Sequence, residues 1–311
     1  MNGALLISKH SGVSSFGVIE LLQKELRKTT GITKRRDLPK MGHGGTLDPF
    51  ATGLLVVLVG RGVKLAQYFL GSIKEYEGVM KFGETTIPGD LTDPISQTTS
   101  TLPDSLEQIE QAAREFTLRP YSQTPPMHSA KKQNGKPLYE LARAGIEVER
   151  KPKLCRIYQF NILSYDQPFA TYQVRCSAGT YIRTLAQDLA HSMHSLAYLK
   201  TLHRTRSGGF SVQQSWSVEQ IENAHQCWDQ LPCWVPFDQL LNHFPKVTAT
   251  EYEAQCLIHG KQHVLEDLIQ RAELLNDSPY LAIYHQERLI SIARCEHASW
   301  RIDRVFTEHD A

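Results

Sequence analysis

One carboxylate in this 311-residue chain stands inside a glycine-rich segment. Asp48 belongs to the sequence GHGGTLDPFATGLL, which runs from Gly42 to Leu55. Glycines permit tight turns and close approach of the backbone to a ligand, and Pro49 restricts Asp48 to extended conformations. The pattern predicts a carboxylate held at a defined angle, followed by a buried strand at 54–59. A simple Asp–Pro turn that leads into a strand is the alternative interpretation.

A second segment places a cation at a predicted helix start. In CSAGTYIRTL, residues 176–185, the pattern predicts a strand, a turn and a helix capped by Thr180. Arg183 then occupies the third helical position, where a cation opposes the helix dipole by about 0.3–1 kcal/mol. An unfavourable charge there favours an anionic partner, either Asp48 or a phosphate group. A solvent-exposed arginine is the alternative interpretation.

Two tyrosines accompany these segments, Tyr76 in KEYEG and Tyr181 in CSAGTYIRTL. Isolated tyrosines are more often core or rim residues than platforms for a base. If both converge on Asp48, however, an aromatic plane can hold an unstacked base beside a carboxylate.

Hydrophobic periodicity predicts the elements that must position these residues. After Pro245 the pattern changes to short β-like runs at 280–284 and 289–293, which predicts a small separate β-rich domain. Before it, we predict strands at 4–8, 54–59, 76–82, 154–165 and 169–176, and helices at about 14–26, 104–116, 138–144 and 181–194.

The composition is that of a globular chain. Hydrophobic residues make up 41% and charged residues 22%, which excludes disordered and collagen-like classes. The chain has no run of 18 apolar residues and no signal-peptide pattern, so we expect a cytoplasmic protein without membrane spans. The cysteines and histidines show no metal-binding spacing, so we expect reduced cysteines and no metal.

The net charge of +1 conceals blocks of opposite sign. Residues 119–206 hold 14 Lys/Arg against 5 Asp/Glu, whereas residues 207–311 hold 7 against 15. The basic block contains a long segment between regular elements, 121–152, and such segments are typical of binding loops. A polyanionic partner, RNA or DNA, is one interpretation, and solvated surface charge is the other.

Together these motifs resemble the bacterial tRNA pseudouridine-55 synthases, the TruB family. The segment around Asp48 resembles the family's catalytic-aspartate motif. The family's K-P-x-G segment reads KHSG at 9–12 here, and its T-D-T-x-D loop reads TIPGD, which keeps Asp90. The further matches, in chain order, are GRGVKLAQYFL, KEYEG, PPMHSAKKQNGKPLYELARAGIEV, CSAGTYIRTLAQDL and LHRTRSGGF.

The resemblance implies an α+β fold with two domains. The catalytic domain, 1–245, is expected on a mixed, mainly antiparallel sheet, with a basic RNA-binding insertion at about 121–152. A small PUA-like β domain is expected at 246–311. The implied activity is isomerisation of uridine 55 in the T loop of tRNA, with the T-arm as partner and neither metal nor cofactor. We expect a monomer.

The resemblance also implies roles for individual residues. Asp48 is the expected catalytic carboxylate for a flipped uridine, and it either forms a covalent adduct or assists removal of the 2′ proton. Arg183 is expected to pair with Asp48 and keep it ionised, and Tyr76 to stack on the target base. The other expected substrate-binding positions are His43, Lys64, Asp90, Tyr181 and Leu202.

Two other functional classes are alternatives. An RNA-binding or tRNA-folding protein would share the basic insertion but would not need Asp48 with Arg183. A glycosidase requires two carboxylates that flank the scissile bond, and no second acidic residue stands in a comparably constrained motif.

Overall fold

The computed structural model describes residues 1–129, 132–133, 135–272 and 278–307. Within these ranges nine strands form the main sheet, in the order β11-β12-β4-β13-β3-β1-β15, with β14 beside β13 and β2 beside β3. Neighbouring strands are antiparallel except for β3 and β13, so the sheet is mixed and mainly antiparallel, as expected. Its strands are β1 (Gly3–Lys9), β2 (Met41–His43), β3 (Thr52–Val59), β4 (Lys74–Phe82), β11 (Ile157–Asp166), β12 (Phe169–Cys176), β13 (Ala197–Ser207), β14 (Phe210–Ser211) and β15 (Trp234–Pro236).

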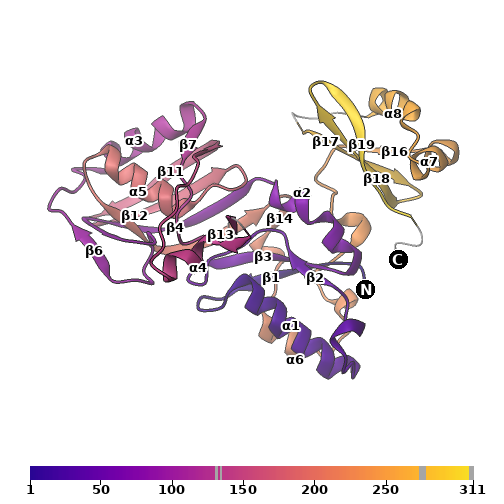
Figure 1. Cartoon of the computed structure of the whole chain (residues 1–311), viewed down its shortest axis with the longest axis horizontal. Helices are drawn as coiled ribbons and strands as arrows, with labels where there is room; N and C mark the ends of the chain where they lie inside the picture. The colour runs from indigo at the N-terminus through magenta and orange to yellow at the C-terminus, as the bar shows by residue number, and fades with distance from the viewer. Residues whose placement is uncertain (130–131, 134, 273–277, 308–311) are drawn as a thin grey trace.

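The centre of the sheet is apolar because β1 and β3 carry almost continuous runs of Leu, Ile and Val. Such runs suit strands that are covered on both faces. Helix α1 (Ser15–Thr30) covers one face near β1 and β3, with α6 (Val218–Ala224) beside it (Figure 1). Ser14 caps α1 by accepting a hydrogen bond from the backbone of Gly17, and Gly31 ends it in the left-handed conformation.

Helix α5 (Ile182–Ser192) begins differently from the sequence prediction. Its N-cap is Tyr181, not Thr180, because the Thr180 hydroxyl donates to the Ser177 carbonyl at 2.9 Å and closes the preceding turn. The side chain of Gln123 instead accepts a hydrogen bond from the Tyr181 N–H at 2.7 Å. Arg183 is therefore the second helical residue rather than the third.

The predicted insertion is closed at its root by two short strands. β7 (Tyr121–Gln123) pairs with β10 (Lys153–Cys155), and α3 (Leu106–Leu118) leads into the insertion with Ser105, not the predicted Asp104, as its cap. Residues 130, 131 and 134 of this segment lie outside the described residues. Other short elements are α2 (Ala66–Leu70), β5 (Glu84–Thr86), β6 (Ile95–Thr98), β8 (Lys132–Gln133), β9 (Lys136–Pro137) and α4 (Leu138–Arg143).

A second sheet forms a C-terminal β-sheet domain, visible at the upper right of Figure 1. In the described part of the chain it has four strands, in the order β16-β17-β18-β19. The sequence predicted only the middle two, and it missed two helices that pack on this sheet. The elements are β16 (Lys246–Thr248), α7 (Glu251–Ile258), α8 (Leu265–Arg271), β17 (Tyr280–His285), β18 (Arg288–Glu296) and β19 (Ser299–Val305).

The two sheets are joined through a packed interface. The ring of Phe306 meets that of Phe237 edge-on, with centroids 5.2 Å apart. Asp238 accepts a hydrogen bond from the Tyr284 hydroxyl at its carbonyl (3.0 Å) and one from the Leu289 N–H at its carboxylate (2.8 Å). These contacts fix the C-terminal domain against the segment that follows β15.

None of the helices that the structure describes is both long and apolar enough to cross a lipid bilayer.

We propose a domain boundary at residues 245–246, immediately before β16, and the interface permits a test. Phe306→Ala removes a buried aromatic ring and should lower the free energy of unfolding by about 3–5 kcal/mol. Because the lost contact joins the domains, calorimetry should resolve two unfolding transitions in place of one. Leu281→Ala, inside the C-terminal sheet, is the control that lowers stability without touching the interface. A single transition in Phe306→Ala would contradict the proposed boundary.

Candidate active site

A cavity of about 310 Å³ lies where the first residues of β4, the last of β12 and the start of α5 meet. It brings together five of the residues singled out in the sequence, which lie far apart along the chain. Its walls include Asp48, Tyr76, Tyr181, Arg183 and Leu202. Since β4 lies between β12 and β13, the order of the strands produces this convergence.

An ion pair forms the centre of this cavity. Arg183 Nε lies 2.9 Å from Asp48 Oδ2. The guanidinium also donates to the carbonyls of Pro88 (2.7 Å) and His128 (2.8 Å), and its Nη1 lies 3.4 Å from Asp90 Oδ2. The side chain of Arg183 is 4% exposed and that of Asp48 is 32% exposed. The predicted pairing of Arg183 with Asp48 is thus confirmed, and the exposed alternative is excluded.

The surroundings of Asp48 act on its pKa in opposite directions. Removal from water raises the pKa of the carboxyl above its usual 3.8, and the nearby Asp90 acts the same way. Arg183 opposes this shift by favouring the ionised form. One oxygen is bound to Arg183 while part of the side chain faces the cavity, so the carboxylate remains accessible to a ligand.

A second buried arginine fixes the loop that carries Asp48. Arg204, on β13, is 1% exposed. Its Nε donates to the Leu54 carbonyl at 2.8 Å, its Nη2 to Gly45 at 3.0 Å and its Nη1 to Thr46 at 3.3 Å. A side chain at Gly53 would lie within 2.4 Å of the Arg204 carbonyl, which explains the glycine there.

The other side of the loop is held by Lys9 and Ser15. Lys9 Nζ donates to the carbonyls of Val13 (2.8 Å) and Pro49 (3.2 Å), and burial lowers its pKa to about 8. Ser15 accepts a hydrogen bond from the Leu47 N–H at 2.8 Å and donates to the Leu47 carbonyl at 2.9 Å. The KHSG segment, although it lacks the family's proline, still supplies a lysine that anchors Pro49.

Lys74 contributes an amine to the cavity wall. Its Nζ donates to the carbonyls of Phe69 (2.6 Å) and Ser72 (2.8 Å), which ties β4 to α2. Burial, together with the charge of Arg204, lowers the pKa of Lys74 to about 7. Tyr76 lies opposite Arg204 in the strand register, and burial raises the pKa of its hydroxyl, which is therefore neutral at pH 7.

The remaining predicted residues lie outside the cavity wall. Asp90 is buried behind Arg183, and its carboxylate accepts the Thr92 N–H at 2.9 Å. His43, on β2, is half-buried; in the described part of the chain its Nδ1 has no hydrogen-bond partner, and burial lowers its pKa. Lys64 lies in a 3-10 turn at 60–65, also away from the cavity.

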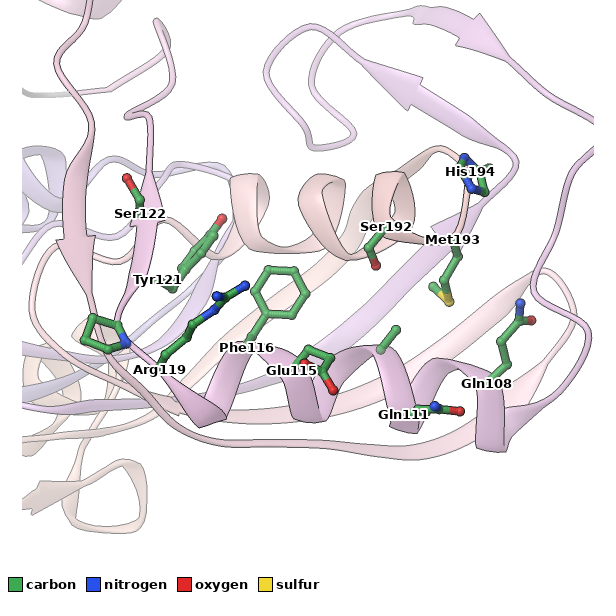
Figure 2. A pocket seen from close by; sticks show the side chains of 12 residues that line it. Gln108, Gln111, Glu115, Phe116, Arg119, Tyr121, Ser122, Ser192, Met193 and His194 are labelled. Carbon is green, nitrogen blue, oxygen red and sulfur yellow. The ribbon is translucent and has the colours of Figure 1, made fainter.

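A larger cavity of about 790 Å³ lies between α3 and α5. Figure 2 shows the side chains of Phe116, from α3, and of Met193, just after α5, in the space between the two helices, with Glu115 and Arg119 along α3. None of the residues predicted from the sequence lines it. Its size alone does not indicate chemistry, because it lacks a buried carboxylate–guanidinium pair like that of the smaller cavity.

Sequence reasoning missed three residues that build the site: Lys9, Lys74 and Arg204. Each belongs to a motif named above: Lys9 to KHSG, Lys74 to KEYEG and Arg204 to LHRTRSGGF. The only sequence signal for a role in the site was a charged residue in a predicted strand or turn. Within the described ranges, no group of three or more His, Cys, Asp or Glu residues is arranged to hold a metal ion.

Two solved structures, both of chains in larger complexes, have a similar fold. The chain in a Cbf5–Nop10–Gar1 complex superposes with a TM-score of 0.71 at 22% identity, covering 99% of this chain and 86% of that one. The chain in an H/ACA RNP bound to a substrate RNA containing 2′-deoxyuridine gives 0.68 at 20% identity, with coverages of 99% and 86%. The chain therefore shares the fold of these two proteins.

Sequence comparison then assigns the family. A model described as TruB family pseudouridylate synthase, N-terminal domain, matches residues 30–182. The tRNA pseudouridine synthase B of Neisseria meningitidis serogroup B is 36% identical over 296 residues, 94% of this chain and 90% of that protein. That of Bordetella parapertussis is 40% identical over 226 residues, 71% and 87% of the two chains. This chain belongs to the TruB family of pseudouridine synthases, which are isomerases.

The opposing effects on Asp48 predict shifts of opposite sign in two variants. In the wild type, ¹³C NMR of the Asp48 carboxyl should give a titration midpoint above 3.8. Arg183→Met removes the stabilising cation and should move the midpoint further up, whereas Asp90→Asn removes a repelling anion and should move it down. Equal midpoints in the three proteins would contradict this electrostatic account.

Proposed function

We propose that this chain converts uridine 55 in the T loop of tRNA to pseudouridine, with Asp48 as the catalytic carboxylate. The ion pair of Asp48 with Arg183, in the wall of a cavity whose volume suits a small ligand, is the observation that carries the proposal. The names of the relatives from Neisseria and Bordetella support tRNA as the substrate.

The reaction exchanges one glycosidic bond for another. The target uridine leaves its stack and enters the cavity. Its N1–C1′ bond breaks, the uracil turns while bound, and a C5–C1′ bond forms; C5 then loses a proton and N1 gains one, so atoms and charge balance. Asp48 either adds covalently or assists removal of the 2′ proton. Both routes require an ionised carboxylate, which Arg183 favours.

The aromatic and apolar walls serve the base itself. Tyr76 provides a buried ring against which a uracil can stack, and Tyr181 and Leu202 complete the wall around it. Burial raises the pKa of both tyrosine hydroxyls, so each is a neutral hydrogen-bonding group at pH 7. We assign Asp90 to positioning Arg183, and His43 and Lys64 to RNA contacts outside the cavity.

The insertion is the segment proposed to bind the T-arm. Its root already forms part of the site, because the carbonyl of His128 accepts a hydrogen bond from Arg183 and Ser129 lines the cavity. The basic residues of 121–152 suit the phosphate backbone of RNA. We propose a monomer as the working unit.

Asp48→Asn tests the catalytic assignment. It should reduce pseudouridine formation by more than about a thousandfold, because the amide can neither add to the sugar nor accept its proton. Binding of tRNA should stay within about tenfold, since the shape is kept. The measurement is tritium release from tRNA labelled at C5 of uridine.

Asp166→Asn, the same change at an exposed position, is the matched control and should release tritium as the wild type does. Turnover by Asp48→Asn would overturn the mechanism. Binding of tRNA without tritium release by either the wild type or Asp48→Asn would instead favour an RNA-binding or tRNA-folding role.

Replacement of Lys131, Lys132 and Lys136 together by Gln tests binding by the insertion; of these, Lys131 lies outside the described residues. Loss of three phosphate contacts should weaken tRNA binding and flatten its salt dependence by about two to three units of slope. Filter binding over a salt series gives both quantities. Unchanged affinity across that series would show that these lysines of the insertion do not bind the tRNA.

A further inference from the structure

A row of cations lies on the face of the main sheet opposite the cavity. Arg175 on β12 and Arg206 on β13 flank Glu75 on β4, and both are paired with it in the strand register. Arg175 Nε lies 3.6 Å from one Glu75 oxygen, and Arg206 Nε lies 4.0 Å from the other. A register shift between Arg204 and Arg206 turns Arg206 outward, whereas Arg204 faces the cavity.

Tyr158 extends this row on the neighbouring strand, β11. The guanidinium of Arg175 lies 5.7 Å from the centre of the Tyr158 ring, and that of Arg156 lies 5.5 Å from it. The tyrosine therefore holds two cations through cation–π contacts. Lys153 lies three residues before Arg156 at the root of the insertion, where its Nζ donates to the Ala178 carbonyl at 3.0 Å.

We call Lys153, Arg156, Arg175 and Arg206 the sheet-end row. Its charge is not balanced within the protein, since Glu75 is the one carboxylate that the described residues place in an ion pair with it. Those contacts are longer than a good charged hydrogen bond. The side chains of Arg175 and Arg206 are 49% and 48% exposed, so about half of each faces solvent.

The sheet-end row and the cavity share one loop, residues 177–180. Ser177, Gly179 and Thr180 line the cavity. On its other side this loop is bound to Arg156, whose carbonyl accepts the Ser177 N–H at 2.8 Å and whose N–H donates to the Ser177 hydroxyl at 2.9 Å. An RNA strand that leaves the cavity over this loop meets Lys153 and Arg156 first.

We propose that the sheet-end row is a second RNA-binding surface, separate from the insertion, which binds phosphate groups of the nucleotides next to the one in the cavity. The proposal rests on the proposed function, because it takes the cavity as the site of the target base. Exposed arginine forks, two of them held on an aromatic ring, suit phosphate oxygens.

The test replaces Arg156, Arg175 and Arg206 by Gln in one protein. Lys153 is left in place because its contact with Ala178 supports the cavity loop. The dissociation constant for full-length tRNA should rise at least about tenfold at 0.1 M salt, and the slope of log affinity against log salt should become shallower by about two to three units. Filter binding over a salt series measures both.

Two matched variants make the outcome specific. Replacing the same three arginines by Lys keeps the charge and should retain most of the affinity. Replacing Lys24, Arg27 and Arg114 by Gln removes three exposed cations elsewhere, on α1 and α3, and should leave the slope within one unit of the wild type.

Equal salt slopes for the Gln variant of the row and the α1/α3 variant would overturn the proposal, as would a Lys variant that binds as weakly as the Gln variant. Tritium release by the wild type separates failure of the sheet-end row from failure of the proposed function. If the wild type releases tritium while the row variant binds normally, the row has failed and the proposed function stands. If the wild type releases none, the function has failed whatever the row does.

Discussion

The buried guanidinium of Arg183 is the constraint on which the site depends. Taking an arginine out of water costs several kcal/mol unless its N–H groups are paired. Here the partners come from separate segments: Asp48 from the glycine-rich loop, Pro88 and Asp90 from the loop after β5, and His128 from the insertion. Each of these segments must reach α5 for the charge to be satisfied, so one side chain fixes three loops.

Arg204 is a second buried guanidinium, and its partners differ from those of Arg183. Among the described residues no carboxylate forms an ion pair with it, and its guanidinium donates to backbone carbonyls of the loop before Asp48 and of β3. Its charge also lowers the pKa of Lys74 and of His43, after the larger effect of burial. Arg183 and Arg204, with Lys9 and Lys74 when these are protonated, place positive charge around the half-buried carboxylate of Asp48, an arrangement that suits a polyanionic substrate.

A cation at a helix start is unfavourable without an anion, which pointed to Asp48 or a phosphate as the partner of Arg183, and the resemblance to the TruB family implied Asp48. The sequence did not predict the helical position of Arg183, since the Thr180 hydroxyl closes its own turn and a glutamine from a distant strand takes over the cap. The roles of Lys74 and Arg204 could not be predicted from the sequence for another reason. Charged residues are expected at the surface, and only the packing of β4 between β12 and β13 shows that these two point inward.

The C-terminal helices escaped prediction because they are short and only partly apolar; α7 depends on a capping box between Thr250 and Glu253 and on burial of Leu257 against the sheet. Isolated helices of this length are marginal in water. Their formation therefore depends on tertiary contacts that a local pattern does not contain. The same limit applies to the strands β16 and β19, which are defined by their neighbours rather than by alternation.

The root of the insertion joins substrate binding to the chemistry through backbone contacts. Gln123 is buried, and its side chain both accepts from the Tyr181 N–H and donates to the Tyr181 carbonyl, at 2.7 and 3.0 Å. The same short stretch includes His128, whose carbonyl accepts a hydrogen bond from Arg183. It therefore holds both Tyr181, in the cavity wall, and Arg183, the partner of the Asp48 carboxylate. A displacement of this root would leave a buried N–H and part of a buried guanidinium without partners, at a cost of about 1–3 kcal/mol for each group. The loop proposed to bind RNA is for this reason also a structural part of the ion pair, and the position of one cannot change independently of the other.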